Sequence, residues 1–328
     1  MSKRQSPDWH PSVSLATLRA RAQLNAEVRH FFAERDVLEV ETPVLGHGGS
    51  TDVHLASLSL EAQTVEGRER LWLQTSPEFH MKRLLAAGSG PIFQLARSFR
   101  DGEIGARHNI EFTMLEWYRP GLSLDALIDE CDALIRRLLP CDPGPLRRQR
   151  YRTLFRSALD IDPFTGSLET LRALAGEAGS LSMFDADREG CLDLLMSLVI
   201  EPTLGQGGID VVVDYPAAQA ALARKRRDPE DGALVAARFE IYLSGLELAN
   251  GYDELIDADE QRSRFEEDNR QRKALSRPEV APDARLIAAL EAGMPPSSGV
   301  ALGLDRLIML ALDKKRVADV MAFATPDC

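Results

Sequence analysis

Two runs of alternating side chains, at residues 93–100 and 111–118, constrain the fold of this chain more than any other feature of its sequence. In the first run, one face carries Phe93, Leu95, Arg97 and Phe99, and the other carries Gln94, Ala96, Ser98 and Arg100. In the second run, one face carries Phe112, Met114, Glu116 and Tyr118. A period of two residues is that of a β-strand, whose side chains alternate between the two faces of a sheet. Residues 101–110 are polar and contain glycine, so the pair predicts an antiparallel hairpin with a long loop.

The remaining periodic segments predict helices packed beside further strands. We expect helices over residues 14–34, 76–88, 123–138, 257–275 and 304–312, and strands over residues 37–41, 53–60, 71–75, 211–215, 238–247 and 298–303. Ser76, Pro77 and Glu78 suit the N-cap, the first-turn proline and the first-turn acid of the second helix. Residues 140–150 are interpreted as a connector, and residues 151–203 as mainly helical. A mostly antiparallel sheet flanked by helices is an α+β architecture.

Composition excludes several classes of protein. The 328 residues include Lys+Arg 39 and Asp+Glu 51, a net charge of −12, which argues against a general nucleic-acid coat because phosphate binding needs a basic surface. Local basic patches at residues 147–150 or 224–227 stay open. The four cysteines form no CxxC pair, so we expect neither a disulfide framework nor a zinc site. A polar start and the lack of a long apolar run predict a soluble, cytoplasmic protein without a membrane partner.

The common catalytic and nucleotide-binding motifs are absent. The sequence contains no HExxH, no GxSxG, no GK followed by Ser or Thr, and no complete GxGxxG. A nucleotide would therefore have to bind without either of the two common phosphate loops.

Three distant segments nevertheless suit phosphoryl or nucleotidyl chemistry. Arg100 ends a predicted strand, Glu247 and Glu254 are predicted to bracket a glycine turn, and Arg306 opens a helix directly after Gly303. Arginines can neutralise phosphates, carboxylates can hold Mg²⁺, and a glycine lets a flat ring approach the backbone. On spacing alone, however, ordinary salt bridges at a hairpin and a helix end are the favoured interpretation.

A family resemblance favours nucleotide chemistry over ordinary salt bridges as the role of these residues. Residues 97–100 (RSFR) followed by residues 108–118 (HNIEFTMLEWY) resemble motif 2 of the class II aminoacyl-tRNA synthetases. Residues 299–306 (GVALGLDR) are similar to motif 3, and the first helix with residues 40–43 (VETP) is similar to motif 1, the dimer-forming element. Residues 75–85 (TSPEFHMKRLL) and 247–254 (ELANGYDE) narrow the resemblance to the lysyl branch. The resemblance implies a class II catalytic domain over residues 14–328, with a mainly helical insert at about 140–208 and an N-terminal extension at residues 1–13.

Within the lysyl branch, the chain resembles the family of elongation factor P–(R)-β-lysine ligases, which are paralogues of lysyl-tRNA synthetase. Motif 1 begins close to Met1, so we expect no anticodon-binding barrel, and Ala301 stands where lysyl synthetases usually have glycine. The resemblance implies ATP-dependent activation of (R)-β-lysine or lysine as an adenylate. Transfer to a lysine side chain of elongation factor P would then form an amide. ATP and Mg²⁺ are the implied cofactors, a homodimer is the implied assembly, and tRNA is an unlikely partner.

The resemblance also implies roles for individual residues. The catalytic residues would be Arg100, Glu247 and Arg306, with Glu247 as the metal ligand. ATP would also be bound by Asp101, Gly102, Glu103, His108, Asn109, Phe112, Leu248 and Gly303. The amino-acid substrate would be bound by Ser76, Pro77, Glu78, Glu116, Tyr118, Asn250, Glu254 and Ala301.

Two departures from the family pattern concern the loop of motif 2. In the family pattern an acid lies two positions after the arginine; here Gly102 occupies that position, and the acid is Glu103, one position later. Ile110 replaces a proline that is common in the family. Neither change removes a charged group.

Two rival functions stay open. One is another enzyme on the same scaffold, which aminoacylates tRNA or makes asparagine; Glu254 and Tyr118 disfavour an acidic substrate. The other is a non-catalytic regulatory paralogue, which the retained Arg100 and Arg306 disfavour and which would give no ATP–pyrophosphate exchange.

Overall fold

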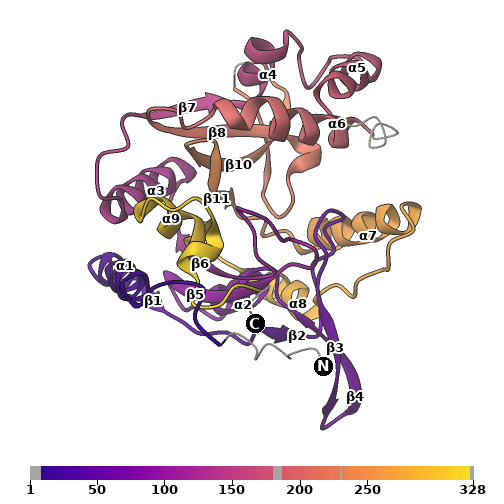
Figure 1. The fold of residues 1–328 in the computed structure, drawn as a ribbon. Helices are drawn as coiled ribbons and strands as arrows, with labels where there is room; N and C mark the ends of the chain where they lie inside the picture. The colour runs from indigo at the N-terminus through magenta and orange to yellow at the C-terminus, as the bar shows by residue number, and fades with distance from the viewer. Residues whose placement is uncertain (1–8, 180–186, 230, 326–328) are drawn as a thin grey trace, which may run out of the picture.

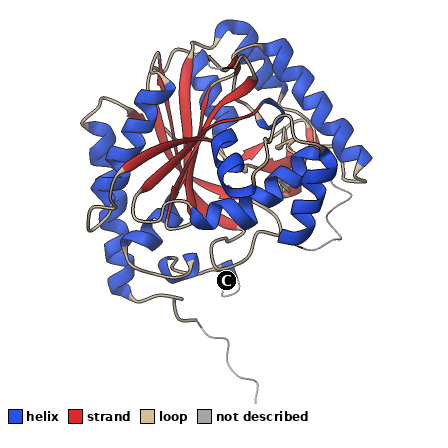
Figure 2. Cartoon of the chain, turned by 90° about the horizontal axis from the view of Figure 1, so that it is seen from above, coloured by secondary structure: helices blue, strands red, loops and turns tan. Residues whose placement is uncertain are grey.

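The computed structural model describes residues 9–179, 187–229 and 231–325 of the chain. A nine-stranded sheet runs through the molecule with helices around it, and a separate three-stranded sheet projects beside the N-terminal part (Figures 1 and 2). No helix among the described residues has both the length and the apolar character needed to cross a membrane.

The large sheet is mostly antiparallel. Its path is β1 (Leu38–Glu39), β5 (Ile92–Phe99), β6 (Glu111–Pro120), β12 (Ser297–Gly303), β11 (Leu246–Asp253), β10 (Leu234–Leu243), β8 (Ile209–Pro216) and β7 (Leu146–Arg150), and β9 (Lys225–Arg227) pairs with β10. The parallel pairs are β1 with β5 and β7 with β8. The small sheet has the order β2 (Leu45–Gly46), β4 (Gly67–Leu73), β3 (Ser59–Thr64).

The predicted hairpin is confirmed as β5 and β6. Gln94 pairs with Glu116, Glu116 pairs with Ala301 on β12, and Ala301 pairs with Asn250 on β11, which in turn pairs with Glu240 on β10. Paired residues point to the same face of a sheet, so these five side chains form one row across five strands. The register thus assembles a polar floor from segments far apart in the sequence.

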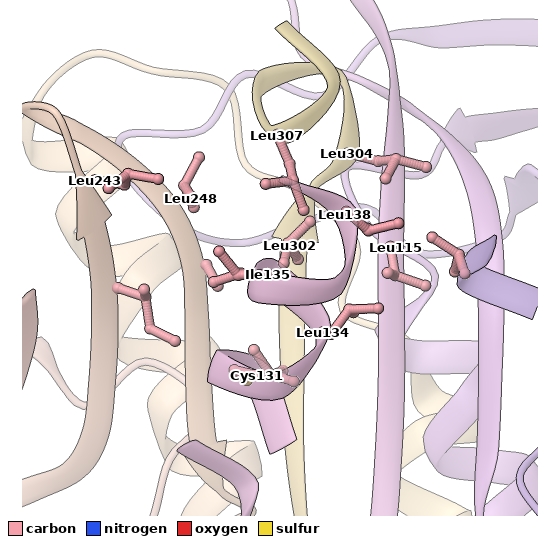
Figure 3. Close-up of a cluster of buried hydrophobic side chains, with 14 of the residues drawn as sticks. Leu115, Cys131, Leu134, Ile135, Leu138, Leu243, Leu248, Leu302, Leu304 and Leu307 are labelled. Carbon is pink, nitrogen blue, oxygen red and sulfur yellow. The ribbon is translucent and has the colours of Figure 1, made fainter. Parts of the chain in front are cut away.

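The opposite face of the sheet is covered by α1 (Leu15–Ala33), α3 (Leu124–Leu138) and α9 (Leu304–Ala311). Ser14 and Ser123 cap the first two helices, and each hydroxyl accepts a hydrogen bond from a backbone N–H of the first turn. Figure 3 shows side chains of α3 pointing toward leucines of α9 and of the strands. This core contains Leu115, Cys131, Leu134, Ile135, Leu138, Leu248, Leu302 and Leu307, all buried.

A helical excursion between β7 and β8 builds a second core. It comprises α4 (Tyr151–Leu159), α5 (Leu168–Ala178), α6 (Arg188–Leu195), a π-helical turn (Met196–Ile200) and a 3₁₀ turn (Glu201–Thr203). Tyr151, Phe155 and Leu192 pack with Tyr215 of β8 and Tyr242 of β10. The mainly helical character expected of residues 151–203 is confirmed in the described part, while residues 180–186 lie outside the described residues.

A third core joins α2 (Glu78–Ala86), α7 (Ala258–Ala274) and α8 (Ala284–Gly293). Met81 and Leu85 of α2 pack against Phe265 of α7 and Leu286 and Leu290 of α8. The helix at α8 has no counterpart among the sequence predictions.

Several predicted boundaries were wrong. Helix α2 begins one residue later than expected, and its N-cap is Pro77 instead of Ser76. The Ser76 hydroxyl accepts a hydrogen bond from the backbone N–H of Glu78 at 3.3 Å. Strand β3 begins at Ser59, β1 has only two residues, and the connector expected at residues 140–150 ends in strand β7.

The most important correction concerns the segment before α7. Strand β10 ends at Leu243, the turn lies at Ser244 and Gly245, both with positive φ, and β11 begins at Leu246. Glu247 and Glu254 therefore do not bracket a turn; Glu247 lies near the start of β11 and Glu254 directly follows its end. Position 251, within this strand, requires glycine because a Cβ there would lie 2.3 Å from the Phe239 ring.

The basic patch considered at residues 147–150 is neutralised. Arg147 pairs with Asp210 at 2.7 Å, and Arg148 pairs with Asp125 at 2.7 Å and Asp129 at 2.6 Å. These arginines hold β7 against its neighbours and do not form an open cationic surface.

Candidate active site

A cleft of about 1490 Å³ opens over the polar face of the sheet, opposite α1, α3 and α9. Its walls come from the β5–β6 loop, β6, β11, β12, the start of α2 and the start of α9. Two arginines lie on one side of the cleft, and buried carboxylates lie toward α2.

Arg100 follows β5 and faces this cleft, as its place in the alternation predicts. Its guanidinium lies 5.2 Å from the centroid of the Phe112 ring, and its Nη1 is 3.7 Å from Glu103 Oε1. The Nε of Arg100 is buried without a hydrogen-bond partner in the described part of the chain. A buried donor without an acceptor is costly, so this nitrogen is available to an anionic ligand.

Arg306 lies in the first turn of α9 and contacts both strand β11 and the β5–β6 loop. Its Nη1 donates to the backbone O of Glu247 at 2.9 Å, and its Nη2 lies 2.7 Å from His108 Nε2. Burial, and then the adjacent Arg306 guanidinium, lower the pKa of His108. A neutral imidazole beside a guanidinium leaves the positive charge on Arg306, where a phosphate could be bound.

Carboxylates gather beside Arg306. Burial and the nearby Glu240 raise the pKa of Glu247. Burial, Glu247 and Glu240 raise the pKa of Glu201 to about 7. Neighbouring carboxyl groups disfavour each other's ionisation unless a cation binds between them.

The fit of a metal ion to these carboxylates can be judged from their number. Among the residues that the structure describes, no group of three or more His, Cys, Asp or Glu side chains is arranged to hold a metal ion. Mg²⁺ commonly takes only one or two protein carboxylates together with waters and substrate phosphates. Glu247 therefore suits a nucleotide-bound Mg²⁺, whereas both oxygens of Glu240 already accept hydrogen bonds, from Tyr215 and Tyr242 and from Arg238 and Asn250.

The end of the cleft at α2 is acidic and tightly packed. Lys82 Nζ lies 2.6 Å from Glu78 Oε1 and 2.6 Å from Glu254 Oε2, and the Tyr118 hydroxyl donates to Glu116 Oε1 at 2.6 Å. Burial, and then the charge of Glu78, raise the pKa of Glu116 well above its usual value.

Gly299 makes this packing possible. A Cβ at Gly299 would lie 2.3 Å from the Tyr118 ring and 2.4 Å from Glu254 Oε1. The glycine therefore lets strand β12 pass directly beside both side chains.

Comparison with known proteins is consistent with this geometry. The family model described as tRNA synthetases class II (D, K and N) matches residues 4–326. This chain belongs to that class II family. The expected class II catalytic fold, with a mixed and largely antiparallel sheet, is confirmed, and so is the expectation of a ligase in an ATP-dependent family.

Similar proteins with assigned names cover nearly the whole chain. The elongation factor P–(R)-β-lysine ligase of Mannheimia succiniciproducens is 50% identical over 317 residues, 96% of this chain and 97% of that protein. The protein of the same name from Actinobacillus succinogenes is 49% identical over 322 residues, 98% of each chain. That from Erwinia tasmaniensis is 49% identical over 324 residues, again 98% of each chain. The resemblance proposed from the sequence motifs is confirmed.

Most residues predicted for the site of this class II protein do line the cleft. They are Ser76, Glu78, Arg100, Glu103, His108, Asn109, Phe112, Glu116, Tyr118, Glu247, Leu248, Asn250, Glu254, Ala301, Gly303 and Arg306. Asp101 and Gly102 are exposed, Pro77 is buried, and none of the three is among the residues that line this cleft.

The side chains of two of these lining residues bind or pack against other parts of the protein. Asn109 Nδ2 donates to the Glu111 backbone O at 2.6 Å, and its Oδ1 accepts from the Thr325 N–H at 3.0 Å. The side chain of Leu248 belongs to the core under the sheet. Asn109 thus holds the loop in shape, and Leu248 presents its backbone to the cleft.

Sequence reasoning missed four polar residues of this region. Lys82 follows Glu78 by one helical turn, which was a usable signal for an ion pair. Arg238 and Glu240 lie on the charged face of β10, where Glu240 accepts from Tyr215 at 2.5 Å and pairs with Arg238. Gln261 of α7 lines the cleft with both amide atoms buried and without a partner in the described residues, and no sequence pattern pointed to it.

Proposed function

We propose that this protein uses ATP to activate (R)-β-lysine, or lysine, as an adenylate, and then transfers the aminoacyl group to a lysine side chain of elongation factor P. The observation that carries the proposal is a single cleft with Arg100 and Arg306 on one side and Glu78, Glu116 and Glu254 at the other end. Arginines suit the phosphates and the carboxylate, and the acids suit the amino groups. The names of the similar proteins supply the identities of the amino acid and the acceptor.

In the first step, an oxygen of the amino-acid carboxylate attacks the α-phosphorus of ATP. A carboxylate–phosphorus bond forms, the bond to the bridging oxygen breaks, and pyrophosphate leaves. Arg100, with its free Nε, would offset the charge that builds on the α-phosphate, and Arg306 would hold the far phosphates. No covalent enzyme intermediate is needed, because such residues act by positioning and charge.

Glu247 would hold Mg²⁺ together with the phosphates and waters. The ion supplies charge neutralisation for the leaving pyrophosphate. The nucleobase would lie against Gly303, where a Cβ would meet the Arg306 side chain at 3.4 Å and the Leu248 backbone O at 3.8 Å, both ordinary contact distances. Neither contact requires glycine there, which fits a close approach by a ligand.

At the acidic end, Glu254 and Tyr118 would bind the distal ammonium of the substrate, and Glu78 the nearer amine. Ala301 lies on the floor of the cleft between Glu116 and Asn250, so its methyl group would set the depth available to the substrate.

In the second step, the ε-amine of the acceptor lysine attacks the adenylate carbonyl carbon. An amide bond forms, AMP leaves, and the amine gives up its proton. The attacking amine must be neutral, so removal of its proton is part of this step.

For the molecule as a whole, we propose a class II catalytic domain at residues 14–328, with an insert at about 140–208 and an extension at residues 1–13, that forms a homodimer in the cytoplasm. Leu38, on edge strand β1 of the large sheet, is an apolar side chain exposed by 56% and supports a dimer contact there. Neither acceptor, protein or tRNA, is assigned to the 147–150 patch, because Asp125, Asp129 and Asp210 neutralise its arginines.

Intact-mass spectrometry tests the proposal. Elongation factor P is incubated with the protein, ATP, Mg²⁺ and (R)-β-lysine, in parallel with a tRNA-charging assay. We expect the factor to gain the mass of one β-lysyl residue while tRNA stays uncharged. Charged tRNA with unmodified factor would instead identify a tRNA synthetase, and no ATP–pyrophosphate exchange with any amino acid would identify a non-catalytic paralogue.

A further inference from the structure

Lys82 is a buried cation that contacts two acids of the cleft from behind. Its side chain is 1% exposed, and its Nζ lies 2.6 Å from one oxygen each of Glu78 and Glu254. Both acids line the cleft, whereas Lys82 is not among its lining residues. Lys82 therefore reaches the cleft only through the two carboxylates that it holds.

We propose that Lys82 is a positioning residue that determines specificity: it places one ammonium between Glu78 and Glu254 and holds the two carboxylates at a fixed separation, so that the cleft selects an amino acid with two ammonium groups. The inference rests on the proposed function, in which these two carboxylates bind the two amines of the substrate.

The physical reason is the cost of two carboxylates buried side by side. Without a cation between them, such a pair keeps a shared proton, and one member is neutral. Burial raises the pKa of Glu254 to about 8, and the neighbouring Lys82 ammonium opposes that rise. Lys82 places one ammonium 2.6 Å from an oxygen of each acid, and each acid offers its other oxygen to the substrate.

The surroundings restrict where those free oxygens can lie. Glu254 Oε2 is taken by Lys82, and its Oε1 lies against strand β12 at Gly299. Glu78 and Lys82 belong to the same helix, one turn apart, so their pairing is fixed by α2. Lys82 thus joins α2 to the end of β11 and sets the distance between the two ammonium positions.

Glu116 does not supply a third charge of the same kind. It accepts a hydrogen bond from Tyr118 and is fully buried, and burial raises its pKa well above the usual value. The two acids held by Lys82 are therefore the carboxylates placed to meet the two amines.

The test compares two substrates in ATP–pyrophosphate exchange. (R)-β-Lysine is compared with (R)-3-aminoheptanoic acid, in which a methyl group replaces the terminal ammonium. We expect the wild-type protein to prefer β-lysine strongly. In Lys82→Met, the ratio of the two kcat/KM values should fall by about thirtyfold or more, while the KM for ATP changes by less than about threefold.

Control variants separate this role from a structural one. Lys82→Gln, which keeps a hydrogen-bond donor beside the acids, should lose the preference as well and covers the case in which Lys82→Met fails to fold. Lys273→Met, at an exposed position of α7, should keep the wild-type preference. A folded Lys82 variant with an unchanged substrate ratio would overturn the inference and leave the proposed function intact. A wild-type protein that gives no exchange with β-lysine would overturn the proposed function.

Discussion

Arg100 is the residue on which the first chemical step depends most directly. It follows β5 on the cleft face, stacks over Phe112 and keeps a buried Nε without a partner. Arg100→Ala should lower the rate of ATP–pyrophosphate exchange by about a hundredfold or more, because a charge-stabilising donor is lost from a preorganised site. Circular dichroism and thermal unfolding should match the wild type.

A matched control is Arg70→Ala on β4, because Arg70 is 63% exposed and pairs only with Glu61 across the small sheet. It should exchange at the wild-type rate. An Arg100→Ala protein with normal exchange would show that this arginine does not contact the α-phosphate.

Gly303 provides a second test at the scale of a residue. Its φ is −69°, and an added Cβ would meet the Arg306 side chain at 3.4 Å, so Gly303→Ala should fold normally. If a nucleobase lies against this glycine, the added methyl should raise the KM for ATP by about tenfold. Gly46→Ala in the small sheet, where contacts begin at 3.5 Å, is the control. An unchanged KM for ATP in Gly303→Ala would place the nucleobase elsewhere.

Site residues that lie in an alternating strand pattern or in a family motif could be predicted from the sequence. The alternation placed Glu116 and Tyr118 on one face of their strand and Arg100 opposite the apolar face of the other strand, and family motifs pointed to Glu247, Glu254 and Arg306. Lys82 and Glu240 were missed because each is defined by a buried partner from another element, which local periodicity does not contain.

At the scale of elements, Asp305 links three of them. Its Oδ1 lies 2.6 Å from Arg21 of α1, and its Oδ2 accepts from the backbone N–H of Thr113 on β6 at 2.6 Å. Because Asp305 also precedes Arg306 in the first turn of α9, this contact connects the first helix of the chain to the phosphate side of the cleft.

We expect Asp305→Asn to lower the free energy of unfolding by about 3 kcal/mol, because Arg21 is left with a largely buried and unpaired charge. Chemical denaturation measures this, and exchange kinetics on the folded protein should show a lower kcat as well. Arg21→Met combined with Asp305→Asn should recover part of the lost stability. If the single variant is as stable as the wild type, the ion pair does not hold these elements together.

Two elements show why the sequence alone was insufficient at this scale. Residues 146–150 are almost entirely polar, yet they form β7 because Asp210, Asp125 and Asp129 neutralise their arginines. A glycine turn was predicted between Glu247 and Glu254, yet this segment forms β11 because Gly251 makes room for Phe239 and Asn250 binds Arg238. Both strands are stabilised by partners that come from elsewhere in the chain.

At the scale of the whole molecule, stability should depend on pH through the acidic cluster around Glu247. The pKa of Glu201 is raised from 4.5 to about 7 in the folded protein, so between these values the folded state binds more protons than the unfolded state. The contribution of Glu201 to stability is therefore lost as pH rises through this window. Relative to the wild type, Glu201→Gln should become progressively more stable from pH 4.5 to pH 7 and then change no further.

Denaturant unfolding at several pH values measures this difference. Glu66→Gln, in the exposed turn between β3 and β4, should follow the wild type at each pH. A Glu201→Gln difference that does not vary with pH would contradict the raised pKa.

The proposed dimer makes a second prediction for the whole molecule. Leu38→Asp places a charge on an exposed apolar residue of edge strand β1, so it should convert a dimer into a monomer in analytical ultracentrifugation. Val65→Asp, at the fully exposed tip of the β3–β4 turn, should leave the sedimentation coefficient unchanged. If the wild type and Leu38→Asp sediment alike, this surface does not form the contact.

The position of β12 within the sheet has a consequence for how the protein is made. It pairs with β6 on one side and β11 on the other, yet it follows both of them in the chain. During synthesis on the ribosome, the two halves of the sheet therefore emerge before the strand that unites them. Each half then exposes an unpaired edge, at β6 and at β11, and pairings so distant in sequence form slowly. The nascent chain is consequently most vulnerable to aggregation just before β12 emerges, and that one strand joins the half of the cleft that bears Arg100 to the half that bears Glu247.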